Sequence, residues 1–504
     1  MKKNLSKAVC AALVLTMLLA LTGCGGSEEA AEGRTDIIIG VASEPGNLDP
    51  NESLGASLNE SMAACLASLG DDLQPQPDIA KSWTVSDDGL TYVFEIDTDR
   101  KFANGDNVTP SDVVFSLQRA SDYPGNTMYF DCLDTFEATD DSHVTCTLKY
   151  PCALFLSYMA DSSSTIVCQK VVEAAGSEYG INPAGSTAGP YDFVSWEPGV
   201  CVKFTANPYF NEELAIKDIE FRFITEQSTG AISVEAGDID VYMAPNYIDV
   251  VNLKDSDKVS TFTQTQCGFD FLGFNVNVEP YDDIRVRQAI SYSFDREELV
   301  LAAIGEGGAT PADGFLSDMM FGHTDNVISY ERNPEKAREL LKEAGYEDGL
   351  EITIITMDGS RNKVAEYLQD TMKESGITVN IEMSEWSKFV DDLIKGNVGA
   401  FIIGVSGDIP DADGTFFPQF RTDAGQNVHG YSNKEVDEKL LIARQSSDSE
   451  ERLQMYEDVQ NILMEELPCI PLYFSLKNVL YNSDLQNFSC NYSSDILVKN
   501  MSWK

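Results

Sequence analysis

Residues 266–299 read QCGFDFLGFNVNVEPYDDIRVRQAISYSFDREEL, and the rest of the chain is organised around them. Phenylalanines and valines between positions 269 and 278 favour a strand, and the proline and aspartates at 280–283 favour a turn. Residues 284–299 carry apolar side chains at helical spacing. We interpret this strand, turn and helix as the place where the chain leaves one lobe and begins another.

Composition indicates a large globular protein. The 504 residues are enough for two or three domains at about 100 to 200 residues each. Lys and Arg number 35 against 82 Asp and Glu, which gives a formal net charge of −47. A negative field of that size repels phosphate, so we expect neither nucleic acid nor anionic lipid headgroups as partners.

The N-terminus has the pattern of an export signal. Lys2, Lys3 and Lys7 precede an apolar run at 8–21, which is too short to span a bilayer as a stable helix. The following Leu-Thr-Gly-Cys at 21–24 resembles a bacterial lipobox, and this resemblance implies that Cys24 is lipidated. We expect a signal peptide at 1–23 and a lipidated tether at 24–35, with no other segment long and apolar enough to cross a membrane.

Nine cysteines follow the tether, and no two of them form a C-x-x-C pair. Several lie in apolar runs, where cysteine behaves as a small hydrophobic residue. An odd number cannot all pair with one another, so the pattern predicts several free thiols and leaves room for one or two disulfides. The nine are Cys65, Cys132, Cys146, Cys152, Cys168, Cys201, Cys267, Cys469 and Cys490.

Local patterns in the first half predict strands and one capped helix. Residues 36–41 form an apolar run typical of a buried strand, and the Asp-Asp-Gly at 87–89 predicts a turn between two further strands. A helix is predicted to begin at Thr109, with Pro110 in its first turn and Asp112 completing a capping box.

The second half alternates strands with helices. Asn333 is placed to cap a helix that Pro334 begins and Gly345 ends. Predicted strands at 351–356, 377–383 and 399–405 alternate with predicted helices at 363–375 and 386–395, and a further helix is predicted at 451–466. This alternation predicts a largely parallel α/β sheet.

The strand ending FNVN and the following PYDDIRVRQAISYSFDRE resemble a signature of the peptide and nickel class of solute-binding proteins, family 5, which serve ABC importers. Segments at 48–50, 77–119, 182–210, 236–241 and 468–474 resemble the same family. The resemblance implies an α/β, two-lobed clamp like type II periplasmic binding proteins, with an extra subdomain in lobe one. The expected division is 36–57, 186–265 and 476–504 for lobe one, 58–185 for the extra subdomain, and 266–475 for lobe two.

Ligands of open α/β sheets bind beyond the carboxyl ends of the strands. In lobe two these ends are the predicted loops 357–361, 384–386 and 406–413. Trp386 is either a stacking wall for the ligand or a core residue, and Ser406 opens the third loop. We therefore expect the ligand-binding residues in these three loops.

The resemblance assigns roles to two charged residues. Asp408 matches the aspartate that peptide binders use for the ligand's α-ammonium, and a charge-assisted bond in a poorly hydrated cleft suits that role. Arg361 lies near the position of an arginine that dipeptide binders use for the ligand carboxylate, with a gap in the alignment. The family usually has tryptophan three residues before the aspartate, but this chain has Val405, which implies a wider or reshaped pocket.

Other site chemistries fit the sequence poorly. The glycines at 185–199 are not followed by the Gly-Lys-Ser/Thr of a phosphate-binding loop. Asp411 and Asp413 match part of a calcium loop, but Ile409 and Phe420 occupy two of its ligand positions. The three histidines have no paired metal spacing, and no nucleophile motif is present. We expect no metal, no cofactor and no enzymatic activity.

These observations predict a lipid-anchored, monomeric substrate-binding protein on the extracytoplasmic face of the cell membrane. It would capture di- or oligopeptides by clamp closure and deliver them to an ABC permease and its ATPase. One alternative is the same fold binding a nickel chelate, haem or an oligosaccharide. Another is a surface adhesin or hydrolase that does not transport.

Overall fold

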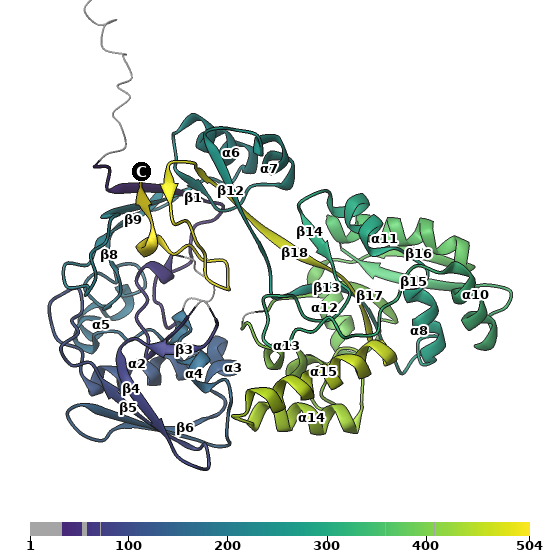
Figure 1. The fold of residues 1–504 in the computed structure, drawn as a ribbon, viewed down its shortest axis with the longest axis horizontal. Helices are drawn as coiled ribbons and strands as arrows, with labels where there is room; N and C mark the ends of the chain where they lie inside the picture. Colours follow the sequence, from purple (N-terminus) through teal and green to yellow (C-terminus); the bar gives the residue numbers. More distant parts are fainter. Residues whose placement is uncertain (1–32, 53–57, 71, 358, 408) are drawn as a thin grey trace, which may run out of the picture.

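The computed structural model describes residues 33–52, 58–70, 72–357, 359–407 and 409–504. Figure 1 shows two lobes joined by the long strands β12 (Val259–Thr265) and β18 (Cys469–Asn482). The first half of β18 pairs with β13 (Phe269–Phe274) and β14 (Ala309–Pro311) in one lobe, and its second half pairs with β12 and with β11 (Val241–Tyr242) in the other. Within the described part of the chain, no helix has the length and apolarity to cross a membrane.

The sheet of the first lobe is built around β1 (Asp36–Val41), where the sequence predicted a buried strand. Strand β1 lies parallel to β10 (Asp218–Phe223) and to β11. Strands β9 (Cys201–Ala206) and β8 (Tyr191–Glu197) continue this sheet in antiparallel register. Helix α6 (Gln227–Ala236) ends at a left-handed Gly237, and the chain then returns to this sheet as β11.

In the second lobe, β15 (Leu350–Thr356) lies parallel to both β16 (Ile377–Met383) and β17 (Ala400–Val405). Strand β17 then pairs antiparallel with β13, and β13 pairs antiparallel with β18. The prediction of a largely parallel sheet was therefore wrong for half of this lobe. The reason is that β18 crosses between the lobes and β13 directly follows the crossing strand β12, so neither strand belongs to the strand-helix alternation.

The predicted helix over 284–299 is interrupted. Helix α8 (Ile284–Ser291) ends, and a four-residue helix α9 (Arg296–Leu299) begins after a turn. The Asp295 side chain accepts a hydrogen bond from the Glu298 amide, so it caps a new helix and does not continue the old one. The preceding strand is shorter than its apolar pattern, because the Asn275 side chain accepts from the Asn277 amide and starts a turn.

The capped helices follow their signals. Helix α2 (Pro110–Asp122) has both hydrogen bonds of the predicted capping box, and α10 (Pro334–Glu343) has Asn333 as its cap. The other helices of lobe two are α11 (Ser360–Thr371), α12 (Trp386–Ile394), α13 (Ala412–Phe420), α14 (Lys434–Gln445) and α15 (Ser449–Glu466). The short helices of lobe one are α3 (Thr127–Phe130), α4 (Phe155–Tyr158), α5 (Gln169–Ala175) and α7 (Tyr247–Leu253).

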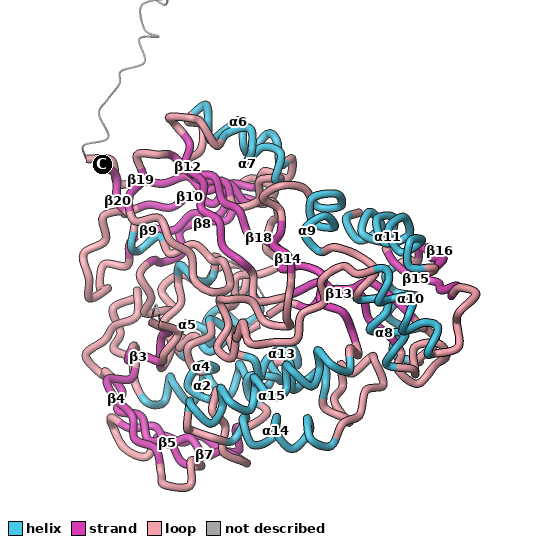
Figure 2. Tube along the Cα trace, turned by 45° about the vertical axis from the view of Figure 1, so that its right-hand side comes forward, coloured by secondary structure: helices cyan, strands magenta, loops and turns pink. Residues whose placement is uncertain are grey.

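The predicted extra subdomain contains an antiparallel sheet of its own, in the order β4 (Ala80–Val85), β5 (Thr91–Ile96), β7 (His143–Leu148) and β6 (Leu133–Ala138). Short pairs are formed by β2 (Ala67–Leu69) with β3 (Pro75–Pro77) and by β19 (Leu485–Gln486) with β20 (Ser502–Trp503). Figure 2 shows this subdomain beside the helices α14 and α15 of lobe two, and the Ala153 amide donates to the Arg444 carbonyl at 2.9 Å.

Buried apolar side chains form separate cores. One core draws on residues 267–474, a second on 64–188 together with Ile409, and a third on 37–62, 191–243 and 479–501. We propose the domain boundaries given above, and these separate cores support them to within a few residues. None of the nine described cysteines forms a disulfide, and eight of them are buried.

Candidate ligand-binding site

Two cavities meet at the carboxyl end of β17, between the lobes. The larger has a volume of about 880 Å³ and the smaller about 380 Å³. Gly404, Val405 and Ser406 line both. The site therefore lies at a strand end, where open α/β sheets bind their ligands.

The smaller cavity is polar. Arg361, in the first turn of α11, donates from Nε to Oδ1 of Asp270 on β13 at 2.7 Å. Gly404 on β17 pairs with Asp270, and a Cβ built there would come within 2.8 Å of both Arg361 Nη2 and Asp270 Oδ2. A glycine at this position therefore lets the ion pair lie across the end of β17.

Two further glycines let the backbone segments of this cavity approach each other. A Cβ on Gly268 would come within 2.0 Å of the Val405 carbonyl oxygen, and one on Gly407 would come within 2.5 Å of the Cys267 backbone. Real Cβ atoms do not approach other atoms so closely. The chain crossing between lobes is therefore packed directly against the end of β17. Lobe one closes the other side of the cavity with residues 492–494.

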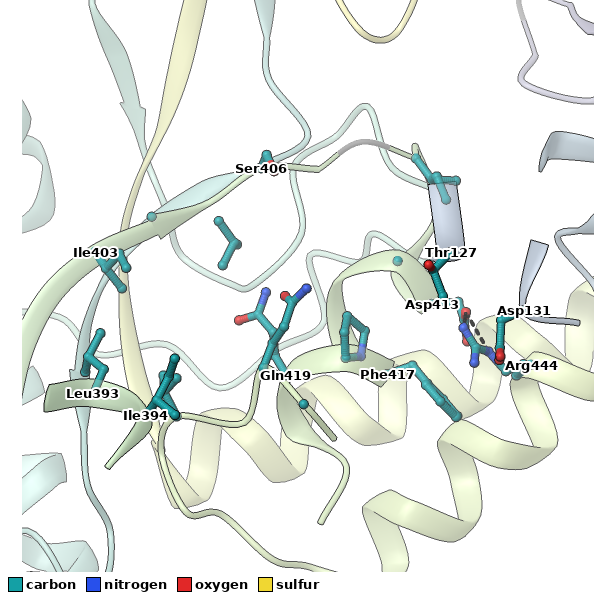
Figure 3. Close-up of a pocket in the computed structure, with 18 of the residues that line it drawn as sticks. Thr127, Asp131, Leu393, Ile394, Ile403, Ser406, Asp413, Phe417, Gln419 and Arg444 are labelled. Atoms are coloured by element: carbon teal, nitrogen blue, oxygen red, sulfur yellow. Dashed lines mark hydrogen bonds and ion pairs between the residues drawn. The ribbon is translucent and has the colours of Figure 1, made fainter. Parts of the chain in front are cut away.

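The larger cavity is mainly apolar, and Figure 3 shows Leu393, Ile394 and Ile403 together at one end of it. The Gln419 amide, from α13, lies toward its middle (Figure 3). The extra subdomain contributes the opposite wall, which consists of Thr127, Asp131, Cys132, Tyr150, Cys152 and Tyr158.

One acidic and one basic side chain at that opposite end are paired with each other. Asp413 and Arg444 form an ion pair at 2.9 Å, and the guanidinium carbon lies 3.6 Å from the Phe417 ring centroid. Burial raises the pKa of Asp413, whereas the Arg444 charge lowers it. Burial alone lowers the pKa of Arg444, but the neighbouring Asp413 carboxylate keeps that pKa above its usual value. We therefore take the pair as ionised. Asp411 is likewise bound by both carboxylate oxygens to Arg452.

The predicted site residues fall into both cavities. Arg361 lines the polar cavity, Trp386 lines the apolar one, and Ser406 lines both. The Trp386 side chain is 53% exposed, so it forms a cavity wall and is not a core residue. Asp408 and Cys24 lie outside the described residues. The ligand contacts of all these side chains stay predictions.

Several lining residues escaped the sequence patterns. Asp270 carries a weak local signal, since it is a charged residue inside an apolar strand, Phe-Asp-Phe-Leu. Residues 127–158 and 492–494 carry none, because they reach the site from more than 80 positions away in the chain. In the described ranges, no group of three or more His, Cys, Asp or Glu side chains is placed to hold a metal.

Comparison with known proteins gives the family. The family described as bacterial extracellular solute-binding proteins, family 5 Middle, matches residues 74–427. The glutathione-binding protein GsiB of Salmonella choleraesuis is 29% identical over 474 residues, which cover 90% of this chain and 91% of that one.

Two solved structures share the fold. HbpA2 from Haemophilus parasuis has a TM-score of 0.86 at 24% identity, over 93% of this chain and 100% of its own. MppA, described as a periplasmic murein tripeptide binding protein in its unliganded open form, has a TM-score of 0.83 at 22% identity, over 93% of this chain and 97% of its own. The predicted two-lobed α/β clamp is therefore confirmed. Because the family match covers well over half of its length, the chain belongs to family 5 of the bacterial extracellular solute-binding proteins, the substrate-binding components of ABC transporters.

Proposed function

We propose that this protein captures short peptides outside the cytoplasmic membrane and delivers them to the permease and ATPase of an ABC importer. The observation that carries the proposal is the junction of a polar and an apolar cavity along residues 404–406. A peptide has the matching parts, because charged ends, a hydrogen-bonding main chain and apolar side chains lie close together. The tripeptide and glutathione named for two of its relatives support a ligand of this size.

The charged ends of the peptide are assigned to two residues. The Asp270 carboxylate holds the Nε edge of Arg361, and we propose that the Nη groups donate to the ligand carboxylate. Asp408 is proposed to accept from the ligand ammonium. Its neighbours Gly407 and Ile409 line the polar and the apolar cavity respectively, which supports a role at their junction.

Clamp closure follows from walls on both lobes. A ligand that contacts residues 127–158 and 492–494 of lobe one and β17 of lobe two favours the conformation in which these surfaces lie closest. Strands β12 and β18 are the connections that would bend. We further propose that the lipid at Cys24 anchors a monomer at the outer face of the membrane.

Titration calorimetry with the full-length protein tests the ligand class. The probes are a tripeptide with free ends, the same tripeptide acetylated and amidated, a nickel–histidine chelate, haem and a trisaccharide. We expect one free-ended peptide to bind per chain and the blocked peptide to bind at least tenfold more weakly. Binding of the chelate, haem or sugar without any peptide binding would contradict the proposal.

A further inference from the structure

The apolar cavity contains a continuous hydrophobic surface from three elements. Helix α12 contributes one face at i, i+4, i+7 and i+8, strand β17 adds two side chains at its end, and α13 adds its middle turn. The residues are Trp386, Val390, Leu393, Ile394, Ile403, Val405, Phe417 and Pro418.

This surface is left open to water. The side chain of Ile394 is 74% exposed and that of Trp386 is 53% exposed, although the same helix packs the buried side chains of Phe389 and Leu393 into the core of lobe two. Exposed apolar surface inside a cavity of about 880 Å³ is typical of a small-molecule site, because such sites usually have 300–1,000 Å³ and largely apolar walls.

Among the described residues, the polar groups around this surface offer no unpaired cation. The Asp413 carboxylate and the Arg444 guanidinium bind each other, and Asp131 accepts from the Tyr150 hydroxyl at 2.7 Å. Gln419 is a neutral amide, suited to a peptide group of the ligand main chain. An acidic ligand side chain placed here would lose its hydration without gaining a partner of opposite charge.

Among the described residues, the two cavities share Gly404, Val405 and Ser406 at the end of β17. A ligand main chain that followed residues 404–406 would have its charged end toward Arg361 in the polar cavity and could direct a side chain into the apolar cavity. Val405 occupies this junction, where a smaller side chain leaves a wider passage than an aromatic one.

We propose that the apolar cavity selects ligands with a bulky apolar side chain, aromatic or branched aliphatic. This inference rests on the proposed peptide-binding function and specifies its substrate class. It also predicts that glutathione, with its two carboxylates and small polar side chains, is a poor ligand here despite the similarity to glutathione-binding relatives.

Calorimetry with a matched tripeptide series tests this selection. The series is Ala-X-Ala, X-Ala-Ala and Ala-Ala-X, with X as Ala, Phe, Leu or Glu, together with reduced glutathione. Burying one such side chain raises the affinity about 10- to 100-fold. The best Phe or Leu peptide is therefore expected to bind more tightly than Ala-Ala-Ala by that factor. Glu peptides and glutathione are expected to bind no better than Ala-Ala-Ala.

Two aspartate substitutions locate the effect. Ile394→Asp changes a mostly exposed side chain in the cavity and is expected to weaken the Phe or Leu peptide at least tenfold, while Ala-Ala-Ala changes less than threefold. Ile232→Asp changes a side chain of similar exposure, 64%, on α6 of lobe one, and is expected to change neither.

The outcomes separate the two proposals. Absence of binding by every peptide would overturn the peptide-binding function itself. Equal binding across the series, a preference for Glu or glutathione, or an Ile394→Asp variant that keeps its preference would overturn the apolar selection and leave peptide binding standing.

Discussion

At the scale of single residues, Gly404 controls the polar cavity. A methyl group there would collide with both Arg361 Nη2 and Asp270 Oδ2. We predict that Gly404→Ala displaces the ion pair and weakens binding of free-ended peptides at least tenfold, measured by calorimetry. Gly46→Ala, where a Cβ meets no atom within 4 Å, is the control and should bind as the wild type does. Equal affinities of both variants for free-ended peptides would show that Arg361 does not bind the ligand.

Asp408 carries the second residue-scale prediction. Replacing it with alanine should weaken free-amine peptides more than tenfold, because a charge-assisted hydrogen bond is lost in a poorly hydrated cleft. Peptides with an acetylated N-terminus should bind the variant and the wild type equally. If the variant keeps its affinity for free-amine peptides, the ammonium is held elsewhere.

His429 makes stability depend on pH. Its ring lies between Phe401 and Phe420, with ring centroids 5.8 Å away on each side, and burial lowers its pKa to about 4. In the unfolded chain the pKa of this histidine is about 6.5. The contribution of the neutral His429 to the free energy of unfolding is therefore fully present above pH 6.5, and it decreases by up to about 3 kcal/mol as the pH falls towards 4.

Glu60 changes the stability in the opposite direction, because burial raises its pKa to about 7. The effect of His429 is therefore measured as a difference between two variants. Stability from Glu60 is lost as pH rises between about 4.5 and 7, in the wild type and in His429→Phe alike. We predict that the difference in melting temperature between wild type and His429→Phe shifts in favour of the variant as pH falls from 7 to 4.5. A constant difference would show that His429 does not titrate in this range.

Residue types at the site were predictable only where a local pattern or the family resemblance marked them. Arg361, Trp386 and Ser406 follow strand ends, and the structure brings them to two adjoining cavities. The acidic Asp411 and Asp413 looked like part of a calcium loop, yet their partners are Arg452 and Arg444 on distant helices. No spacing within the loop could reveal those partners.

At the scale of elements, capping signals were reliable. The Asn333 side chain accepts from the Lys336 amide at 3.0 Å at the start of α10. Asn333→Ala should lower the free energy of unfolding of lobe two by about 1 kcal/mol, whereas Asn333→Asp keeps an acceptor and should change it little. Chemical denaturation followed by tryptophan fluorescence measures both, and equal stabilities for the two variants would contradict the assigned cap.

Periodicity placed most strands and helices within a few residues, but it could not give their partners. Helical spacing continues through residues 284–299, and only the competing cap at Asp295 ends α8 early. The direction of β13 and β18 depends on the crossing between lobes, so a local pattern could not predict antiparallel pairing there.

At the scale of the whole molecule, stability comes from apolar cores and not from disulfides. None of the nine described cysteines forms a disulfide, although the sequence left room for one or two. We predict that a phosphine reductant leaves the melting temperature within about 1 °C of the untreated value. A decrease of several degrees would show that a disulfide forms in the exported protein.

The central claim for the whole molecule is that the clamp holds a short peptide with a bulky apolar side chain. Native mass spectrometry of the gently purified full-length protein tests it most directly, by weighing and fragmenting the bound ligand. We predict one peptide per chain, with a sequence that includes an aromatic or branched aliphatic residue. A bound metal chelate, haem or sugar would contradict this claim, as would an empty protein that takes up nothing from a mixed pool of di- to hexapeptides.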